Sequence, residues 1–97
     1  MWIAERMLHL VDPLSLEREP VVIRVAAPVP VTDSHAFGCT VQLEGLIDDI
    51  RPIQGEDSFQ AVELACRFVH MYLSRSAHTH NLQWPTGEPY REPQPSD

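Results

Sequence analysis

The chain has 97 residues and a formal net charge of −7, with 43% hydrophobic and 22% charged residues. This length suits one domain with one modest core, and the composition excludes a globally disordered chain. The seven basic residues, all arginines, are scattered among 14 acids, which disfavours nucleic-acid binding and suits a basic protein partner.

Membrane association is not expected. No apolar run approaches the roughly 18 to 20 residues that span a bilayer. The first ten residues carry an acid and an arginine inside their apolar stretch and lack a basic leader, so they do not resemble a signal peptide. We expect a cytoplasmic protein.

The first half of the chain predicts two strands. The first runs from Trp2 to Val11 and ends at the turn-forming pair Asp12-Pro13. After a polar connection, a second strand opens at Pro20, with apolar residues alternating up to Ala26. The following segment, Pro28 to His35, is predicted to be a loop because of its two prolines and its Asp-Ser pair.

A third and a fourth strand follow. From Phe37 to Glu44, apolar and polar residues alternate with a period of two, which is typical of an antiparallel sheet with one wet face. Asp48-Asp49 is expected to turn the chain. The fourth strand, Ile50 to Gln54, contains Pro52, which cannot donate to a ladder, so this strand should be short or lie at a sheet edge.

One long helix is predicted from about Asp57 to Arg75. Asp57 is a good N-cap, and Gln60 stands three residues later, as in a capping box. After the helix, Leu82 to Trp84 could dock as a short strand or arm. We therefore predict one α+β domain over residues 1–84 and an extended or disordered proline-rich tail over residues 85–97.

The helix is apolar around most of its circumference. At 100° per residue, its polar stripe is narrow and its apolar arc covers roughly 240°, more than the ~100° that a surface helix usually needs. Ala61 and Ala65 lie near the middle of the arc, where small side chains permit close approach to a sheet. One flank carries Leu64, Phe68 and Met71. The Leu82–Trp84 arm, the loop before the third strand or a second copy of the chain could cover it.

Candidate chemistry is sparse. His70, His78 and His80 lack supporting ligands at zinc spacing, so no metal site is expected. A turn and a helix cap account for the pairs Asp48-Asp49 and Glu56-Asp57 better than acid–base catalysis does. The serines have no nucleophile elbow around them, and the few glycines form no phosphate loop. We expect no catalytic residue, metal or cofactor.

The two cysteines match no metal or redox spacing. Cys39 and Cys66 are therefore expected to be free thiols that behave as small apolar core residues.

Acidic residues gather in the stretch 44–63. If the turn and the helix start lie at one end of the domain, these acids form a patch that could steer a basic partner, and a solvated rim is the alternative. The candidate interaction surface combines acids of this stretch with the apolar helix flank: Leu64, Phe68, Met71, Glu44, Asp48, Asp49 and Glu56.

Three short motifs resemble a family of small uncharacterised bacterial proteins. They are the opening Ile3 to Arg6, the strand ending Glu44 to Leu46, and a G-x-D-S-x-Q-A helix start. In this chain the helix start is carried by Gly55, Asp57, Ser58, Gln60 and Ala61. The resemblance implies a bacterial origin and a fold of strands followed by a helix, and it implies no activity.

Together these features predict an α+β fold in which a four-stranded antiparallel meander carries one long helix on one face and a short C-terminal arm. The favoured function is a non-catalytic protein-interaction domain, either homodimeric or an inhibitor- or immunity-like binder of a basic protein. The alternative is a small-molecule-binding domain or minor enzyme with a pocket between helix and sheet.

Overall fold

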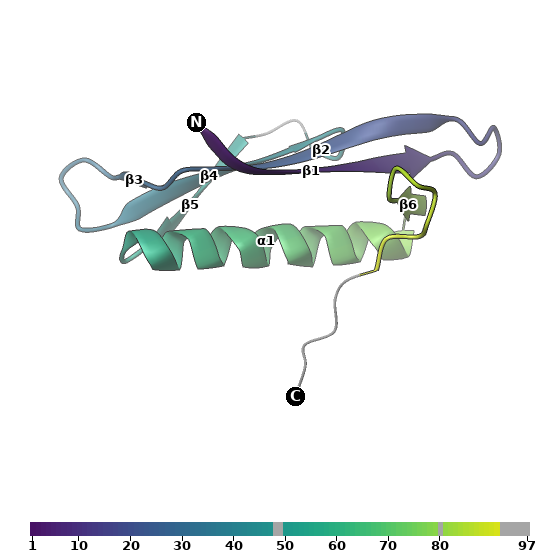
Figure 1. Cartoon of the computed structure of the whole chain (residues 1–97). Helices are drawn as coiled ribbons and strands as arrows, with labels where there is room; N and C mark the ends of the chain where they lie inside the picture. Colours follow the sequence, from purple (N-terminus) through teal and green to yellow (C-terminus); the bar gives the residue numbers. More distant parts are fainter. Residues whose placement is uncertain (48–49, 80, 92–97) are drawn as a thin grey trace.

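The computed structural model describes residues 1–47, 50–79 and 81–91 of the chain. It contains one helix laid across one face of a sheet (Figure 1). The elements in chain order are β1 Trp2–Val11, β2 Arg18–Ala26, β3 Val29–Pro30, β4 Phe37–Glu44, β5 Ile50–Gly55, α1 Ser58–Thr79 and β6 Asn81–Gln83.

All strand pairs in the sheet are antiparallel. β4 pairs with β2 and β3 on one side and with β5 on the other. β1 pairs with β2 and, over its last residues, with β6. The sheet therefore runs from an edge at β5 to an edge at β1 and β6. α1 covers one face, and Figure 1 shows no described helix or strand over the other. The predicted α+β class, with one helix on an antiparallel sheet, is confirmed.

The predicted four-stranded meander is wrong in its strand number, because the described residues form six strands. Val29 and Pro30, placed in a loop by the sequence, pair with Gly38 and Phe37 across a tight turn. Residues 81–83, expected only as an arm or short strand, pair with the end of β1. Strands of two or three residues show no periodicity, so tertiary pairing alone creates them.

The longer elements lie where the sequence predicted them, and some of them extend beyond their predicted bounds. β1 and β4 match at both ends. β5 contains Pro52 and pairs with β4 alone, so it is an edge strand as predicted. β2 begins at Arg18, before the proline expected to open it. α1 continues to Thr79, four residues beyond its predicted end at Arg75.

The core lies between α1 and the covered face of the sheet. α1 packs mainly on β4 and β5, and less on β6 and β2. Ala61 and Ala65 are fully buried, which confirms the small central stripe of the helix. Gly55 at the end of β5 lies so close to the backbone of Ala61 that a side chain there would overlap it. The buried core comprises Leu8, Val21, Ile23, Val25, Cys39, Val41, Leu43, Ala61, Ala65, Val69, Leu73, Leu82 and Tyr90.

The flanks of α1 are unequally covered. Phe68 packs against the core, and the Arg51 guanidinium carbon of β5 lies 6.0 Å from its ring centre. Met71 remains 47% exposed and Phe59 72% exposed. Cys66 was expected in the core, and this is wrong, because its side chain is exposed. The helix lies over the β4–β5 side of the sheet, which leaves its flank towards β1 without a covering strand.

The chain after β6 folds back as a small hairpin. The Trp84 amide donates to the Glu88 carbonyl, and the Tyr90 amide donates to the Leu82 carbonyl at 2.9 Å. Tyr90 is only 4% exposed. Residues 92–97 of the predicted tail lie outside the described residues.

Candidate functional site

The free edge of β1 is the first part of the candidate site. β1 has ten residues, but β6 covers only His9 to Val11. The carbonyl of Leu82 accepts from Tyr90 and so faces away from β1, which means that Asn81 and Gln83 face it. Along a strand, the backbone N–H and C=O groups of successive residues point to opposite sides. Those of Glu5 and Met7 therefore point to the same side as those of His9, away from β2.

Beyond the end of β6, no described residue pairs with these groups. The amide and carbonyl of Glu5, and those of Met7, have no main-chain partner among the described residues on that side. Natural sheets usually shorten, cover or charge such an edge, because it is a template for another strand. Ile3 and Met7, on the same stretch, are 53% and 48% exposed.

A groove lies between this edge and α1. Its volume is about 140 Å³. Since the helix is displaced towards β4 and β5, the space below β1 is left partly open. Small and apolar side chains dominate its lining, and Arg6 and His70 supply the charged or polar side chains. Glu5 belongs to the lining as a residue of β1, but its carboxylate contacts Arg24 on the other face of the sheet. The lining residues are Ala4, Glu5, Arg6, Ile23, Val25, Cys66, Val69 and His70.

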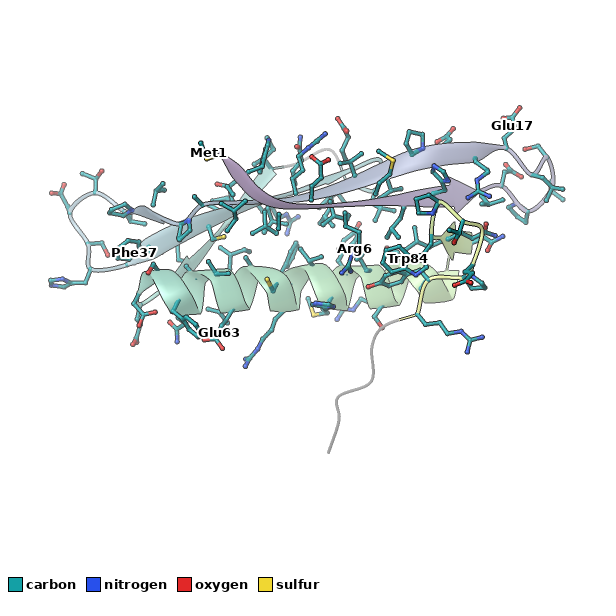
Figure 2. All side chains as sticks on the ribbon, in the orientation of Figure 1. Met1, Arg6, Glu17, Phe37, Glu63 and Trp84 are labelled. Atoms are coloured by element: carbon teal, nitrogen blue, oxygen red, sulfur yellow. The ribbon has the colours of Figure 1, made fainter. Side chains whose placement is uncertain are left out.

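Arg6 stands at one end of the groove, under the C-terminal hairpin. Figure 2 shows Arg6 and Trp84 together on the helix side of the sheet. The guanidinium carbon is 5.3 Å from the Trp84 ring centre and 5.9 Å from that of Tyr90. One nitrogen donates to the Tyr90 hydroxyl at 3.3 Å. A guanidinium has five N–H donors, and among the described residues the others of Arg6 have no acceptor.

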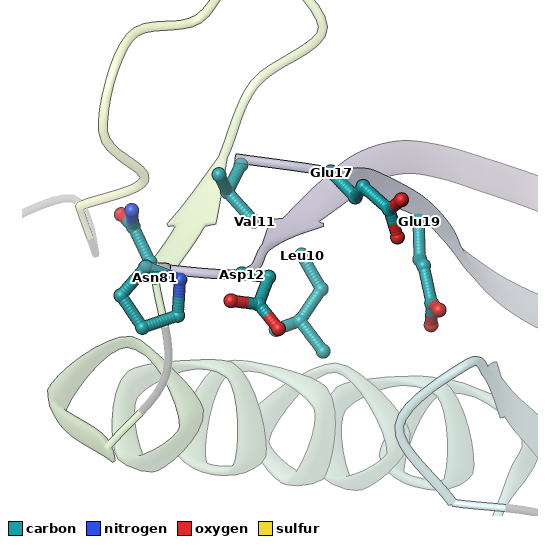
Figure 3. Close-up of a pocket in the computed structure, with 7 residues that line it drawn as sticks. Leu10, Val11, Asp12, Glu17, Glu19 and Asn81 are labelled. Atoms are coloured by element: carbon teal, nitrogen blue, oxygen red, sulfur yellow. The ribbon is translucent and has the colours of Figure 1, made fainter. Parts of the chain in front are cut away.

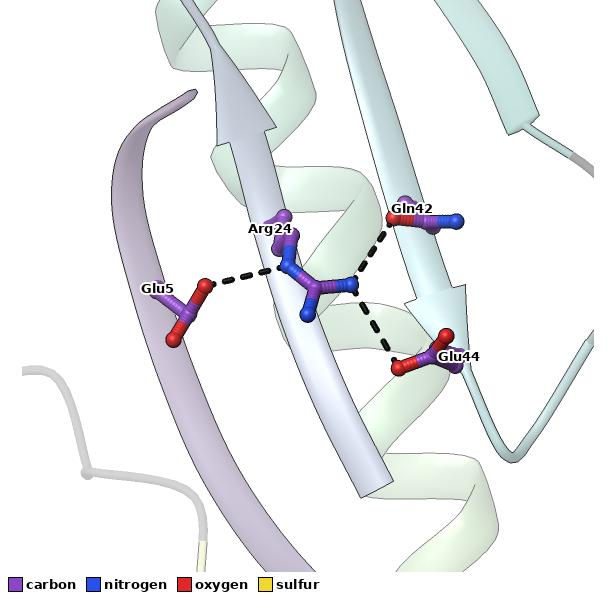
Figure 4. A network of polar contacts seen from close by, with 4 residues as sticks. All are labelled: Glu5, Arg24, Gln42 and Glu44. Atoms are coloured by element: carbon purple, nitrogen blue, oxygen red, sulfur yellow. Dashed lines mark hydrogen bonds and ion pairs between the residues drawn. The ribbon is translucent and has the colours of Figure 1, made fainter. Parts of the chain in front are cut away.

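An ion-pair ladder crosses the uncovered face of the sheet (Figure 4). Arg24 of β2 donates to Glu5 of β1 at 3.0 Å, and to Gln42 and Glu44 of β4 at 3.0 and 3.4 Å. The carboxylates are more than half exposed, so each pair contributes little alone. The ladder does hold the Glu5 side chain on the uncovered face, opposite the groove.

A second hollow lies at the turn end of the β1–β2 hairpin (Figure 3). It has a volume of about 300 Å³ and includes the carboxylates of Asp12, Glu17 and Glu19. Asp12 is already used structurally, because it accepts from the amides of Leu14 and Ser15 at 2.8 and 3.1 Å. These bonds lower the pKa of its carboxyl group. The hollow is acidic and exposed, and it can attract cationic side chains.

The described members of the predicted interaction surface lie on different parts of the fold. Glu44 ends β4 and contacts Arg24, whereas Glu56 follows β5 beside Phe37 at the other end of β4. Residues Asp48 and Asp49 lie outside the described residues. On the helix, Leu64 and Phe68 are half-buried and Met71 is exposed on the side away from the groove. The two described acids of the patch therefore lie apart.

The structure brings no catalytic set together in the part of the chain it describes. In that part, no cluster of three or more His, Cys, Asp and Glu residues could hold a metal ion. His80 and the side chain of His78 lie outside this description. Cys39 is buried, donates to the Ala26 carbonyl at 3.2 Å, and has a raised pKa because burial disfavours its thiolate.

The sequence predicted a pocket between helix and sheet only as an alternative, and it did not place a free edge at β1. The alternation of β1 places Glu5 and Arg6 on opposite faces, but the length of β6 decides whether their main chain is paired. The available signal was a difference in length. Leu82 to Trp84 is bounded by polar residues and a proline, so a strand there is too short to cover the ten residues of the first strand.

Two further findings concern membrane spans and family membership. No helix in the described chain is long and apolar enough to cross a membrane. A family model, Domain of unknown function (DUF6968), matches residues 4–94, and the chain belongs to that family. Neither the curated proteins nor the solved structures contain a match to it.

Proposed function

We propose that this protein is a non-catalytic interaction domain that binds an extended segment of another chain along the free edge of β1. This proposal is carried by the main chain of Glu5 and Met7, which has no partner among the described residues on that side and lies beside a mainly apolar groove. Strand addition uses these features, because main-chain hydrogen bonds supply affinity and side-chain recesses supply specificity.

Size favours a protein segment over a small molecule. Ligand sites usually enclose about 300–1,000 Å³, whereas the groove between α1 and β1 holds about 140 Å³. That space suits one or two side chains of an added strand. The net charge of −7 supports a partner that is basic overall, since opposite charge speeds encounter.

A second copy is the competing source of the strand, because two free edges can pair. Light scattering at several concentrations separates the two cases. We also propose a cytoplasmic location, supported by the composition, and a bacterial origin, supported by the resemblance of three short motifs to those of small bacterial proteins.

A selection of random octapeptides displayed on phage tests the function directly. Met7→Pro removes the outward N–H and blocks strand addition, and proline is tolerated at edges. Met7→Ala keeps the N–H and is the matched control. We expect wild type to enrich peptides that bind Met7→Ala and fail on Met7→Pro, with both variants shown to be folded by thermal unfolding. Absence of any such edge-dependent peptide contradicts the function.

A further inference from the structure

The free edge of β1 presents opposite charges at neighbouring positions. Arg6 points to the helix side, where its unused N–H groups border the groove. Glu5 points to the uncovered face, with its side chain 54% exposed. Residues directly opposite each other in an antiparallel pair have side chains on the same face, about 5 Å apart. An added strand therefore meets the positive charge of Arg6 on the helix side of the sheet and the negative charge of Glu5 on the uncovered face.

β2, which pairs with β1 on its other side, shows which side chains β1 already has as cross-strand partners. β2 places Val22, Ile23, Arg24 and Val25 opposite Met7, Arg6, Glu5 and Ala4. Arg24 thus forms an ion pair with Glu5. Arg6 has the aliphatic Ile23 opposite it and no carboxylate partner among the described residues. An added strand is the remaining place from which an acid can reach Arg6 in register.

A second copy of β1 fits this edge poorly. In an antiparallel pair related by a two-fold axis, one residue lies opposite its own copy. A register centred on Glu5 opposes two glutamates, and one centred on Arg6 opposes two arginines. Like charges directly opposite are destabilising.

The remaining symmetric registers are obstructed. Centring on Ala4 carries the pairing across the irregularity between Trp2 and Ala4. Centring on Met7 places a strand opposite His9, where Gln83 of β6 already pairs.

We propose that the strand bound at this edge comes from a different protein and carries an acidic residue opposite Arg6, followed by a basic residue opposite Glu5. Running antiparallel to β1, its order is apolar opposite Met7, acidic, basic, then apolar opposite Ala4. The last side chain enters the groove over Val25, Val69 and Cys66. This inference rests on the proposed function and adds the chemistry of the partner.

Two synthetic octapeptides of identical composition test the pattern. One carries valine, glutamate, lysine and valine between threonine pairs, and the other carries valine, lysine, glutamate and valine. The first peptide makes two attractive cross-strand pairs, with Arg6 and Glu5, and the exchange of glutamate and lysine in the second makes both pairs repulsive. We therefore expect the first peptide to bind about tenfold more tightly, as measured by fluorescence anisotropy. Arg6→Gln should reduce this preference several-fold. If that variant does not fold, the relative affinity of the two peptides for the wild-type protein is itself the test of the charge pattern.

Hydrogen–deuterium exchange locates the bound peptide. The Glu5 and Met7 amides should become protected, whereas the Arg6 and Leu8 amides are already bonded to β2. Equal binding of both peptides, no binding of either, or binding without protection of Glu5 overturns the charge pattern. Edge-dependent peptides from the phage selection would then still support strand addition itself. A peptide-free dimer that protects Glu5 assigns the edge to a second copy and also overturns the inference.

Discussion

Replacing Gly55 by alanine tests how closely α1 approaches the sheet. A Cβ at residue 55 would lie 2.8 Å from the Cα of Ala61 and 2.8 Å from the carbonyl carbon of Gln60, and it would overlap the Ala61 nitrogen. These are helix backbone atoms, so no rotamer change relieves the clash, and the first turn of α1 must move away from β5.

The first turn holds capping bonds that such a movement disturbs. The Asp57 carboxylate accepts from the Gln60 amide at 2.7 Å, and the Gln60 side chain accepts from the Glu56 amide at 2.6 Å. Overpacking a core costs about 1–3 kcal/mol when side chains can adjust. Because backbone must adjust here, we expect the free energy of unfolding to fall by about 3 kcal/mol.

Urea unfolding followed by circular dichroism measures this loss. With a slope of about 1.5 kcal/mol per molar urea, the midpoint should drop by about 2 M. Gly38→Ala is the matched control, because its nearest neighbour is the Val31 Cγ2 at 3.8 Å, an ordinary contact. We expect Gly38→Ala to stay within about 1 kcal/mol of wild type. Equal midpoints for the two variants would refute the close approach.

The remaining predictions concern the thiols, the hairpin turn and the C-terminal segment. At pH 8, maleimide should label the exposed Cys66 quickly and the buried Cys39 only after unfolding, and edge-binding peptides should slow Cys66 labelling. Asp12 has a pKa lowered from 3.8 by two backbone bonds, so its stabilising effect is complete above about pH 4 and is lost as the pH falls through the folded value. Asp12→Ala should therefore flatten the stability profile in that acid range, and an unchanged slope would contradict the bonds. Tyr90→Ala should lower the free energy of unfolding by about 3–5 kcal/mol, because it removes a buried ring that contacts Arg6. Tyr90→Phe, which removes only the hydroxyl, should lower it by about 1 kcal/mol. A Tyr90→Ala variant as stable as wild type would place Tyr90 outside the domain.

The local sequence pattern was enough to predict a strand with clear alternation of apolar and polar residues and a helix with a clear N-cap. The period of two in β4 and the Asp57 cap of α1 are set by neighbouring residues, so both agree with the structure. The wide apolar arc of α1 correctly indicated that the sheet does not cover the whole helix.

Other features depend on where elements lie relative to one another. The exposure of Cys66 follows from the displacement of α1 towards β5, which no spacing along the helix reveals. The separation of Glu44 from Glu56 follows from the length of β5. The free edge of β1 follows from the brevity of β6 and from its side of the sheet, both of which depend on long-range pairing.

Hydrogen–deuterium exchange of single amides in β1 measures whether the edge of this strand is free. In the free protein, the Glu5 and Met7 amides should exchange quickly, while those of Arg6 and Leu8, which bond to β2, should exchange slowly. Adding the valine–glutamate–lysine–valine peptide should slow Glu5 and Met7 and leave Arg6 and Leu8 unchanged. Slow exchange of the Glu5 and Met7 amides in a peptide-free monomer would contradict a free edge at β1 and, with it, strand addition there.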